Sequence, residues 1–145
     1  MKVLIGIDDS KFSEDVIQAV VTQLRPQNTE VLVLHVLEPI SLGAPPEMAQ
    51  GYAPELEEQK KPAHELVERF AKKLRGAGFE ASTAVEIGDV RVSILDTATE
   101  WHADLIVIGS HGRKRIESFL LGSVAESVAR HAKCSVEVVR VPVGS

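Results

Sequence analysis

Leu105-Ile106-Val107-Ile108-Gly109-Ser110-His111-Gly112 joins an uninterrupted apolar run to a loop that carries two glycines. Such a run is typical of a strand that is buried on both faces of a parallel sheet. After nine further residues, Gly122-Ser123 stand at the head of an apolar stripe with helical spacing. The pattern G-x2-G-x9-G-S therefore predicts a strand, a glycine-containing loop and a helix in succession.

The same alternation extends in both directions along the chain. Apolar residues recur at helical spacing within 16–24, 63–74, 94–101 and 121–128. Further runs rich in β-branched residues cover Lys2 to Ile7, Val31 to Leu37, Ala81 to Ile87 and Val136 to Val141. Strands that alternate with helices from end to end predict an α/β fold, a doubly wound parallel sheet with helices on both faces.

Ligands of such sheets bind beyond the carboxyl ends of the strands. Three segments are predicted to lie at that edge: Asp8 to Ser13, Glu38 to Gly51, and Gly109 to Ser123. The middle segment is rich in proline and glycine, so we expect a loop there. Its extension, Glu38 to Pro54, is either a lid over the site or an unordered segment.

Composition limits the class of protein. The chain has 145 residues, which fits one domain, and a formal net charge of -5, which disfavours polymeric nucleic acid and anionic membranes as partners. A single cysteine, Cys134, excludes an internal disulfide and a cysteine-based metal cluster. The chain shows neither a secretory signal nor a membrane-spanning run, so we expect a cytoplasmic protein.

Each position of the glycine pattern has a physical reason. Gly109 and Gly112 let the backbone approach a ribose or phosphate and permit positive φ. Gly122 and Ser123 begin a helix, whose N–H groups and positive dipole end favour an anion. The alternative is an ordinary strand-to-helix loop with a glycine turn and a capping serine. Neither a G-K-[ST] phosphate loop nor a G-x-G-x-x-G motif after the first strand is present.

The segments 109–113 and 121–126 resemble the signature of the ATP-binding branch of the universal stress proteins. The opening Val3 to Ser10 with Ser13, Gly88-Asp89, the run 103–108 and the tail 131–134 are similar to the same family. The resemblance covers residues 1–145. It implies one Rossmann-like domain with five parallel strands in the order 3-2-1-4-5.

The resemblance also implies a binding site for ATP, with Mg2+ held through the phosphates and without a dedicated metal site or catalytic residue. Its predicted residues are Ile7, Asp8, Val36, Gly109, His111, Gly112, Arg113, Gly122, Ser123 and Val124. Asp8 either contacts the adenine, the ribose or the metal, or caps the next helix together with Asp9. Val36 packs on adenine or in the core. Arg113 offsets phosphate charge or belongs to a solvated loop.

Several functions fit these residues. A nucleotide-binding stress-response protein that acts as a sensor or regulatory module is favoured over a slow ATPase, because Asp8 and His111 are the sole candidate bases and no second motif supports either. A stress protein that binds cyclic AMP, or acts through protein contacts without ATP, is the other alternative. A two-component receiver is excluded, since its aspartate after the third strand is missing.

Two further expectations concern the remaining residues. The family typically dimerises through its last strand, so the resemblance implies a symmetric homodimer through Val136 to Val141. His35, His64, His102 and His131 have no metal-ligand spacing and are interpreted as structural.

Overall fold

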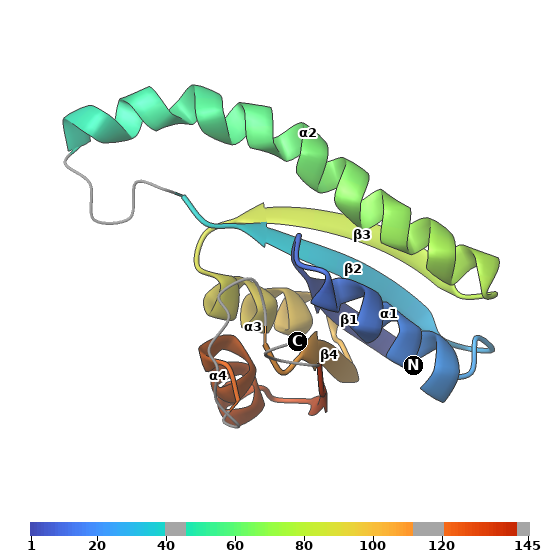
Figure 1. Cartoon of the computed structure of the whole chain (residues 1–145). Helices are drawn as coiled ribbons and strands as arrows, with labels where there is room; N and C mark the ends of the chain where they lie inside the picture. The colour runs from blue at the N-terminus through green and yellow to red at the C-terminus, as the bar shows by residue number, and fades with distance from the viewer. Residues whose placement is uncertain (40–45, 112–120, 142–145) are drawn as a thin grey trace.

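The structure, a computed structural model, alternates strands and helices along the whole described chain (Figure 1). It describes residues 1–39, 46–111 and 121–141, without the side chains of 46–56. Its elements are β1 (Lys2–Ile7), α1 (Phe12–Gln23), β2 (Glu30–Leu37), α2 (Pro46–Gly76), β3 (Glu80–Ile87), α3 (Val90–Trp101), β4 (Leu105–Gly109), α4 (Ser123–His131) and β5 (Ser135–Val139). All neighbouring strands are parallel, in the order β3-β2-β1-β4-β5, which confirms the predicted Rossmann-like sheet.

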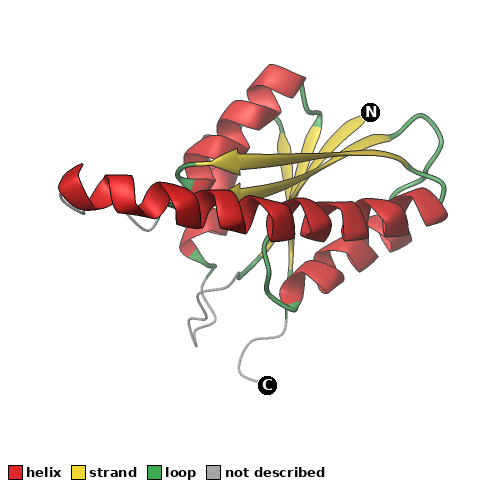
Figure 2. Cartoon of the chain, turned by 90° about the horizontal axis from the view of Figure 1, so that it is seen from above, coloured by secondary structure: helices red, strands yellow, loops and turns green. Residues whose placement is uncertain are grey.

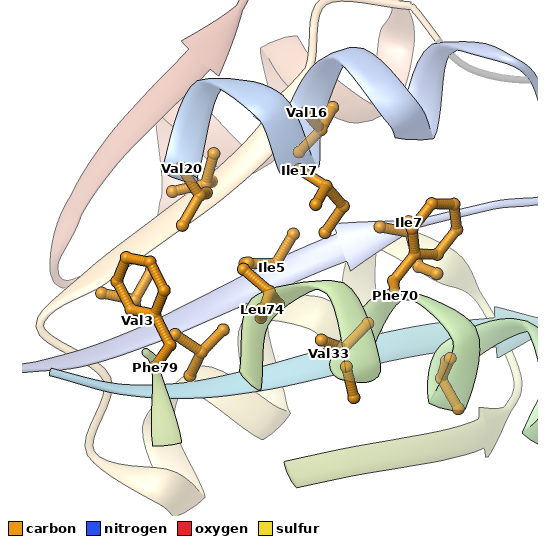
Figure 3. Close-up of a cluster of buried hydrophobic side chains, with 14 residues drawn as sticks. Val3, Ile5, Ile7, Val16, Ile17, Val20, Val33, Phe70, Leu74 and Phe79 are labelled. Atoms are coloured by element: carbon orange, nitrogen blue, oxygen red, sulfur yellow. The ribbon is translucent and has the colours of Figure 1, made fainter. Parts of the chain in front are cut away.

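Helices cover both faces of the sheet (Figure 2). Each face has its own hydrophobic core. On one face, α1 and α2 pack against alternate residues of β1 and β2 (Figure 3). Phe70 and Leu74 are the largest α2 side chains there, and both are almost fully buried. On the other face, α3 and α4 pack through Ile94, Ala125 and Val128. The strands are thus buried on both sides, which explains their continuous apolar runs.

The register of the sheet brings the carboxyl ends of the central strands to one edge. Ile7, at the end of β1, pairs with His35 near the end of β2, and Gly109, at the end of β4, pairs with Val139 of β5. The segments that follow β1, β2 and β4 therefore begin side by side, as the sequence predicted.

The segment after β2 differs from the prediction. Helix α2 begins at Pro46, so the expected loop over 38–51, or 38–54, is wrong from residue 46 onward. Proline is compatible with the first turn of a helix, because its missing N–H is not needed there. The helix includes Pro54 and Pro62, each of which removes one backbone hydrogen bond, and it is bowed in Figure 1.

Two boundaries near the site also differ. β5 ends at Val139 rather than Val141, because the chain there turns to meet Ser110 instead of continuing along β4. Leu121, predicted to belong to the α4 stripe, precedes the helix and is 46% exposed. Within the described residues, no helix is long and apolar enough to cross a membrane.

Candidate functional site

A cleft of about 650 Å³ lies at the carboxyl edge of the sheet. The predicted site residues that line it are Ile7, Asp8, Val36, Gly109, His111, Gly122, Ser123 and Val124. They come from β1, β2, β4 and α4 and from the segments that follow β1 and β4. Gly112 and Arg113, the other two predicted residues, lie outside the described part of the chain. The sequence thus predicted residues that the fold gathers around one cavity.

Asp8 forms a tight turn directly after β1. Its carboxylate oxygen Oδ1 accepts hydrogen bonds from the Ser10 backbone N–H at 2.9 Å and from the Ser10 hydroxyl. The Ser13 hydroxyl donates to the Asp8 carbonyl at 2.8 Å. The residue at the N-cap of α1 is Lys11, so the alternative in which Asp8 and Asp9 cap that helix is wrong. The turn instead fixes the Asp8 carboxylate at the edge of the cleft.

Ser110 joins three parts of the structure beneath the cleft. Its backbone N–H donates to the Val139 carbonyl at 2.8 Å, and its own carbonyl accepts from the Gly122 N–H at 2.8 Å. Its hydroxyl accepts from the Val141 N–H at 3.1 Å and lies 3.2 Å from His111 Nδ1. Ser110 and His111 are both buried. The end of β4, the start of α4 and the segment after β5 are therefore tied to one residue.

The two described glycines of the motif lie in close packing and do not have positive φ. Neither Gly109 nor Gly122 has positive φ, in contrast to Gly78 and Gly88. A Cβ on Gly122 would lie 2.9 Å from the Ser110 carbonyl oxygen, and one on Gly109 would lie 3.2 Å from the carbonyl oxygen of His111. Gly109 thus does not use the positive φ that a glycine permits, and Gly122 has a structural role of its own.

The N-terminus of α4 opens onto the cleft. Gly122 is the N-cap, and no side chain among the described residues caps the helix. Ser123 is exposed at the first helical position, so it is not the capping serine of the alternative interpretation. The first N–H groups of a helix and its dipole together favour an anion at this place.

The charged side chains of the cleft are mostly acidic. Asp8, Asp9 and Glu38 line it, and Arg91 is the one Lys or Arg among its described lining residues. No group of three or more His, Cys, Asp or Glu able to hold a metal ion occurs among the described residues. Within the described lining, an anion would therefore meet more negative than positive side chains.

Sequence reasoning missed several lining residues. Gln59 of α2, Arg91 at the start of α3 and His35 of β2 were not proposed for the site. Gly88 with φ +150° and the N-cap Asp89, whose carboxylate accepts from the Val92 N–H at 3.0 Å, bring the start of α3 to the cleft. The pair Gly88-Asp89 is recognisable in the sequence. It was the signal that could have identified the start of α3 as part of the site.

The family is established by comparison with known proteins. The model of the universal stress protein family matches residues 1–140, so the chain belongs to this family. It is 30% identical over 145 residues to the universal stress protein YxiE of Bacillus subtilis, covering 96% of this chain and 98% of that protein. It is 29% identical to the universal stress protein Sll1388 of Synechocystis, covering 96% and 97%. The solved structure of the hypothetical protein MJ0577 superimposes with a TM-score of 0.82 at 28% identity, covering 97% and 96%.

Proposed function

We propose that this universal stress protein binds ATP, with Mg2+ on the phosphates, in the cleft at the carboxyl edge of the sheet, and acts as a sensor or regulatory module. The observation that carries the proposal is the convergence of Asp8, Val36 and Gly109 on the same cleft as the N-terminus of α4. A mononucleotide has an apolar base, a polar ribose and an anionic end, and these residues offer one surface for each.

The distance across the site, from the end of β2 to the end of β4, suits an extended nucleoside phosphate. β2 and β4 are separated by β1, so their ends lie about 10 Å apart at the usual spacing of strands. The base is placed at Val36 and Ile7, the ribose at Asp8, and the phosphates at Gly122 and Ser123. The helix N-terminus then faces the anionic end of the ligand.

Related folds with bound adenine nucleotides support the same ligand class. Solved family structures are described with AMP for a protein from Arabidopsis thaliana, with cAMP for another family member, and with dAMP for a protein from Archaeoglobus fulgidus. Their TM-scores to this chain are 0.70, 0.66 and 0.68, at 19%, 24% and 24% identity. All three ligands contain adenine, and they differ in the phosphate part.

The charges of the cleft favour binding of ATP together with Mg2+. ATP brings a chain of negative phosphates into a cleft whose described lining has three carboxylates and one guanidinium. A divalent cation held through the phosphates would offset that repulsion. Arg113, which the sequence suggested for the phosphates, would add to Arg91. Chelation of Mg2+ is therefore expected to weaken ATP binding far more than adenosine binding.

The test compares two variants that each add one negative charge to α4. Ser123→Glu places a carboxylate at the proposed phosphate position, where it is also compatible with the helix dipole. Ala129→Glu adds the same charge at an exposed position of the same helix, away from the cleft. At about 6 Å and an effective dielectric of about 20, one added charge opposes one phosphate charge by about 3 kcal/mol before screening.

Calorimetry should show ATP affinity reduced about tenfold or more by Ser123→Glu and within about twofold by Ala129→Glu. Mass spectrometry of nucleotide released from the purified wild type identifies the ligand. Release of ADP would favour the slow ATPase, and release of cyclic AMP the cyclic nucleotide alternative. A protein that is empty and ignores ATP and cyclic AMP would refute nucleotide binding and favour action through protein contacts.

We also propose a homodimer through the last strand. β5 is an edge strand, and its residues Val136 to Val139 are partly exposed. An edge strand with unpaired backbone groups pairs readily with its own copy across a two-fold axis. Val139→Lys is expected to convert the dimer to a monomer in sedimentation, and a dimer that survives this change would exclude the interface. We expect the protein to work in the cytoplasm as one domain over residues 1–145.

A further inference from the structure

His35 lines the cleft, and one of its ring nitrogens is already hydrogen-bonded within the protein. The residue is 9% exposed and pairs with Ile7 in the register of β1 and β2. Its Nδ1 lies 3.0 Å from the Ile7 carbonyl oxygen. Because a carbonyl oxygen only accepts, Nδ1 carries the proton of the neutral ring, and Nε2 is left as a hydrogen-bond acceptor.

Nε2 is the ring nitrogen that the Ile7 contact leaves unused. Within the described residues, Nε2 has no hydrogen-bond or ion-pair partner. Every fully buried side-chain nitrogen or oxygen atom of these residues does have a partner, so Nε2 is not one of the fully buried atoms. Nε2 is thus not sealed inside the core. His35 lines the cleft, which gives the ring its route to solvent. The cleft therefore contains an acceptor whose direction is fixed by the Nδ1 hydrogen bond.

The position of His35 along the cleft determines which part of a ligand it meets. In the sheet it lies opposite Ile7, and strand alternation puts its side chain on the face that α1 and α2 cover, whereas the side chain of Val36 is on the other face. β1 separates it from β4 and from the N-terminus of α4. In the proposed function, on which this step rests, that end of the cleft holds the base. An adenine base presents an exocyclic amino group, which donates, whereas a 6-oxo purine presents a carbonyl oxygen at the same place.

We infer that His35 determines base specificity, with Nε2 accepting a hydrogen bond from the amino group of the bound adenine. Because Nδ1 carries the proton and donates it to the Ile7 carbonyl, Nε2 of the neutral ring cannot donate. The carbonyl oxygen of a 6-oxo base would therefore face Nε2 as a second acceptor, without a hydrogen bond between them. A site that leaves a buried polar pair unsatisfied discriminates more strongly than one that only loses a contact. The histidine that the sequence classed as structural thus gains a second role.

The test measures the ratio of dissociation constants for inosine triphosphate and ATP, which differ at the base and share the triphosphate. The wild type is expected to prefer ATP about tenfold, the effect of roughly one well-placed hydrogen bond. His35→Phe keeps a ring and removes both nitrogens, so the ratio should fall to within about twofold of one. His64→Phe, a change of an exposed histidine outside the cleft, is the matched control and should leave the ratio unchanged.

Nitrogen-detected NMR of the wild-type histidines provides a second reading that does not depend on folding of the variant. His35 should show the Nδ1–H tautomer, and its Nε2 resonance should move on addition of ATP but not of inosine triphosphate. An equal affinity of the wild type for both nucleotides, or an undiminished ratio in folded His35→Phe, would overturn the role of His35 alone. Failure of the wild type to bind either nucleotide would overturn the proposed function and this inference together.

Discussion

Replacing Gly122 by alanine should destabilise the protein even when no ligand is present. The added Cβ would lie 2.9 Å from the Ser110 carbonyl oxygen, closer than real Cβ atoms approach a backbone oxygen. The same oxygen accepts the Gly122 N–H at 2.8 Å, so the contact cannot be relieved without stretching that bond. Overpacking of this kind costs about 1–3 kcal/mol, and a weakened hydrogen bond about 1 kcal/mol more. We expect a total loss of about 2–4 kcal/mol.

Gly76→Ala is the matched control. Gly76 is the last residue of α2 and has no positive φ, and a Cβ added to it would meet no heavy atom within 4 Å outside its own helix backbone. Alanine there should leave stability unchanged or raise it by up to about 1 kcal/mol, since it restricts the unfolded chain and favours the helix.

Urea unfolding in nucleotide-free buffer measures both changes. With an m-value of about 2 kcal/mol/M, the midpoint of Gly122→Ala should fall by about 1 M or more, while that of Gly76→Ala should not fall. A Gly122→Ala midpoint within about 0.2 M of the wild type would refute the packing argument. Because the change acts on folding, loss of nucleotide binding in a glycine variant at this position would say little about the site.

Three other changes test the structure. Ser110→Ala removes the acceptor of the buried Val141 N–H and should cost about 1–3 kcal/mol in the same assay; a neutral result would exclude this hydrogen bond. Phe70→Ala removes one of the largest buried side chains and should cost about 3–5 kcal/mol, measured by thermal unfolding; a loss below about 1 kcal/mol would contradict the burial. Burial, together with the charge of Asp104, raises the pKa of the Cys134 thiol against the opposing effect of a backbone hydrogen bond. Iodoacetamide at pH 8 should therefore alkylate the folded protein more slowly than the urea-unfolded chain, and equal rates would show an ordinary thiol.

The fold could be predicted because its signals are local. Continuous apolar runs identified β1, β2 and β4 within one residue of their observed bounds, and the positions of Val16, Ile17 and Val20 identified α1. The first turns of α2 could not be predicted in the same way. Pro46 and Pro54 favour a loop in a local interpretation, yet the helix accommodates both.

The candidate site was predictable where a residue type carries the signal, and not where the surroundings do. Asp8, Gly109 and Gly122 stand at recognisable positions after strands or before a helix. The role of Ser110 depends on hydrogen bonds to Val139 and Val141, which are distant in sequence and meet it only in the folded sheet. The sequence did not distinguish His35 from the other histidines, because its Nδ1 contact with the Ile7 carbonyl joins two different strands.

The attachment of three segments to Ser110 has a mechanical consequence. The residue lies between two positions of the cleft, Gly109 and His111, and its backbone and hydroxyl also hold the chain at the end of the edge strand. A displacement of Ser110 would therefore disturb both the start of α4 and the end of β5, since the same residue is hydrogen-bonded to each. Ser110 thus connects the wall of the cleft directly to β5, the edge strand along which another molecule could pair.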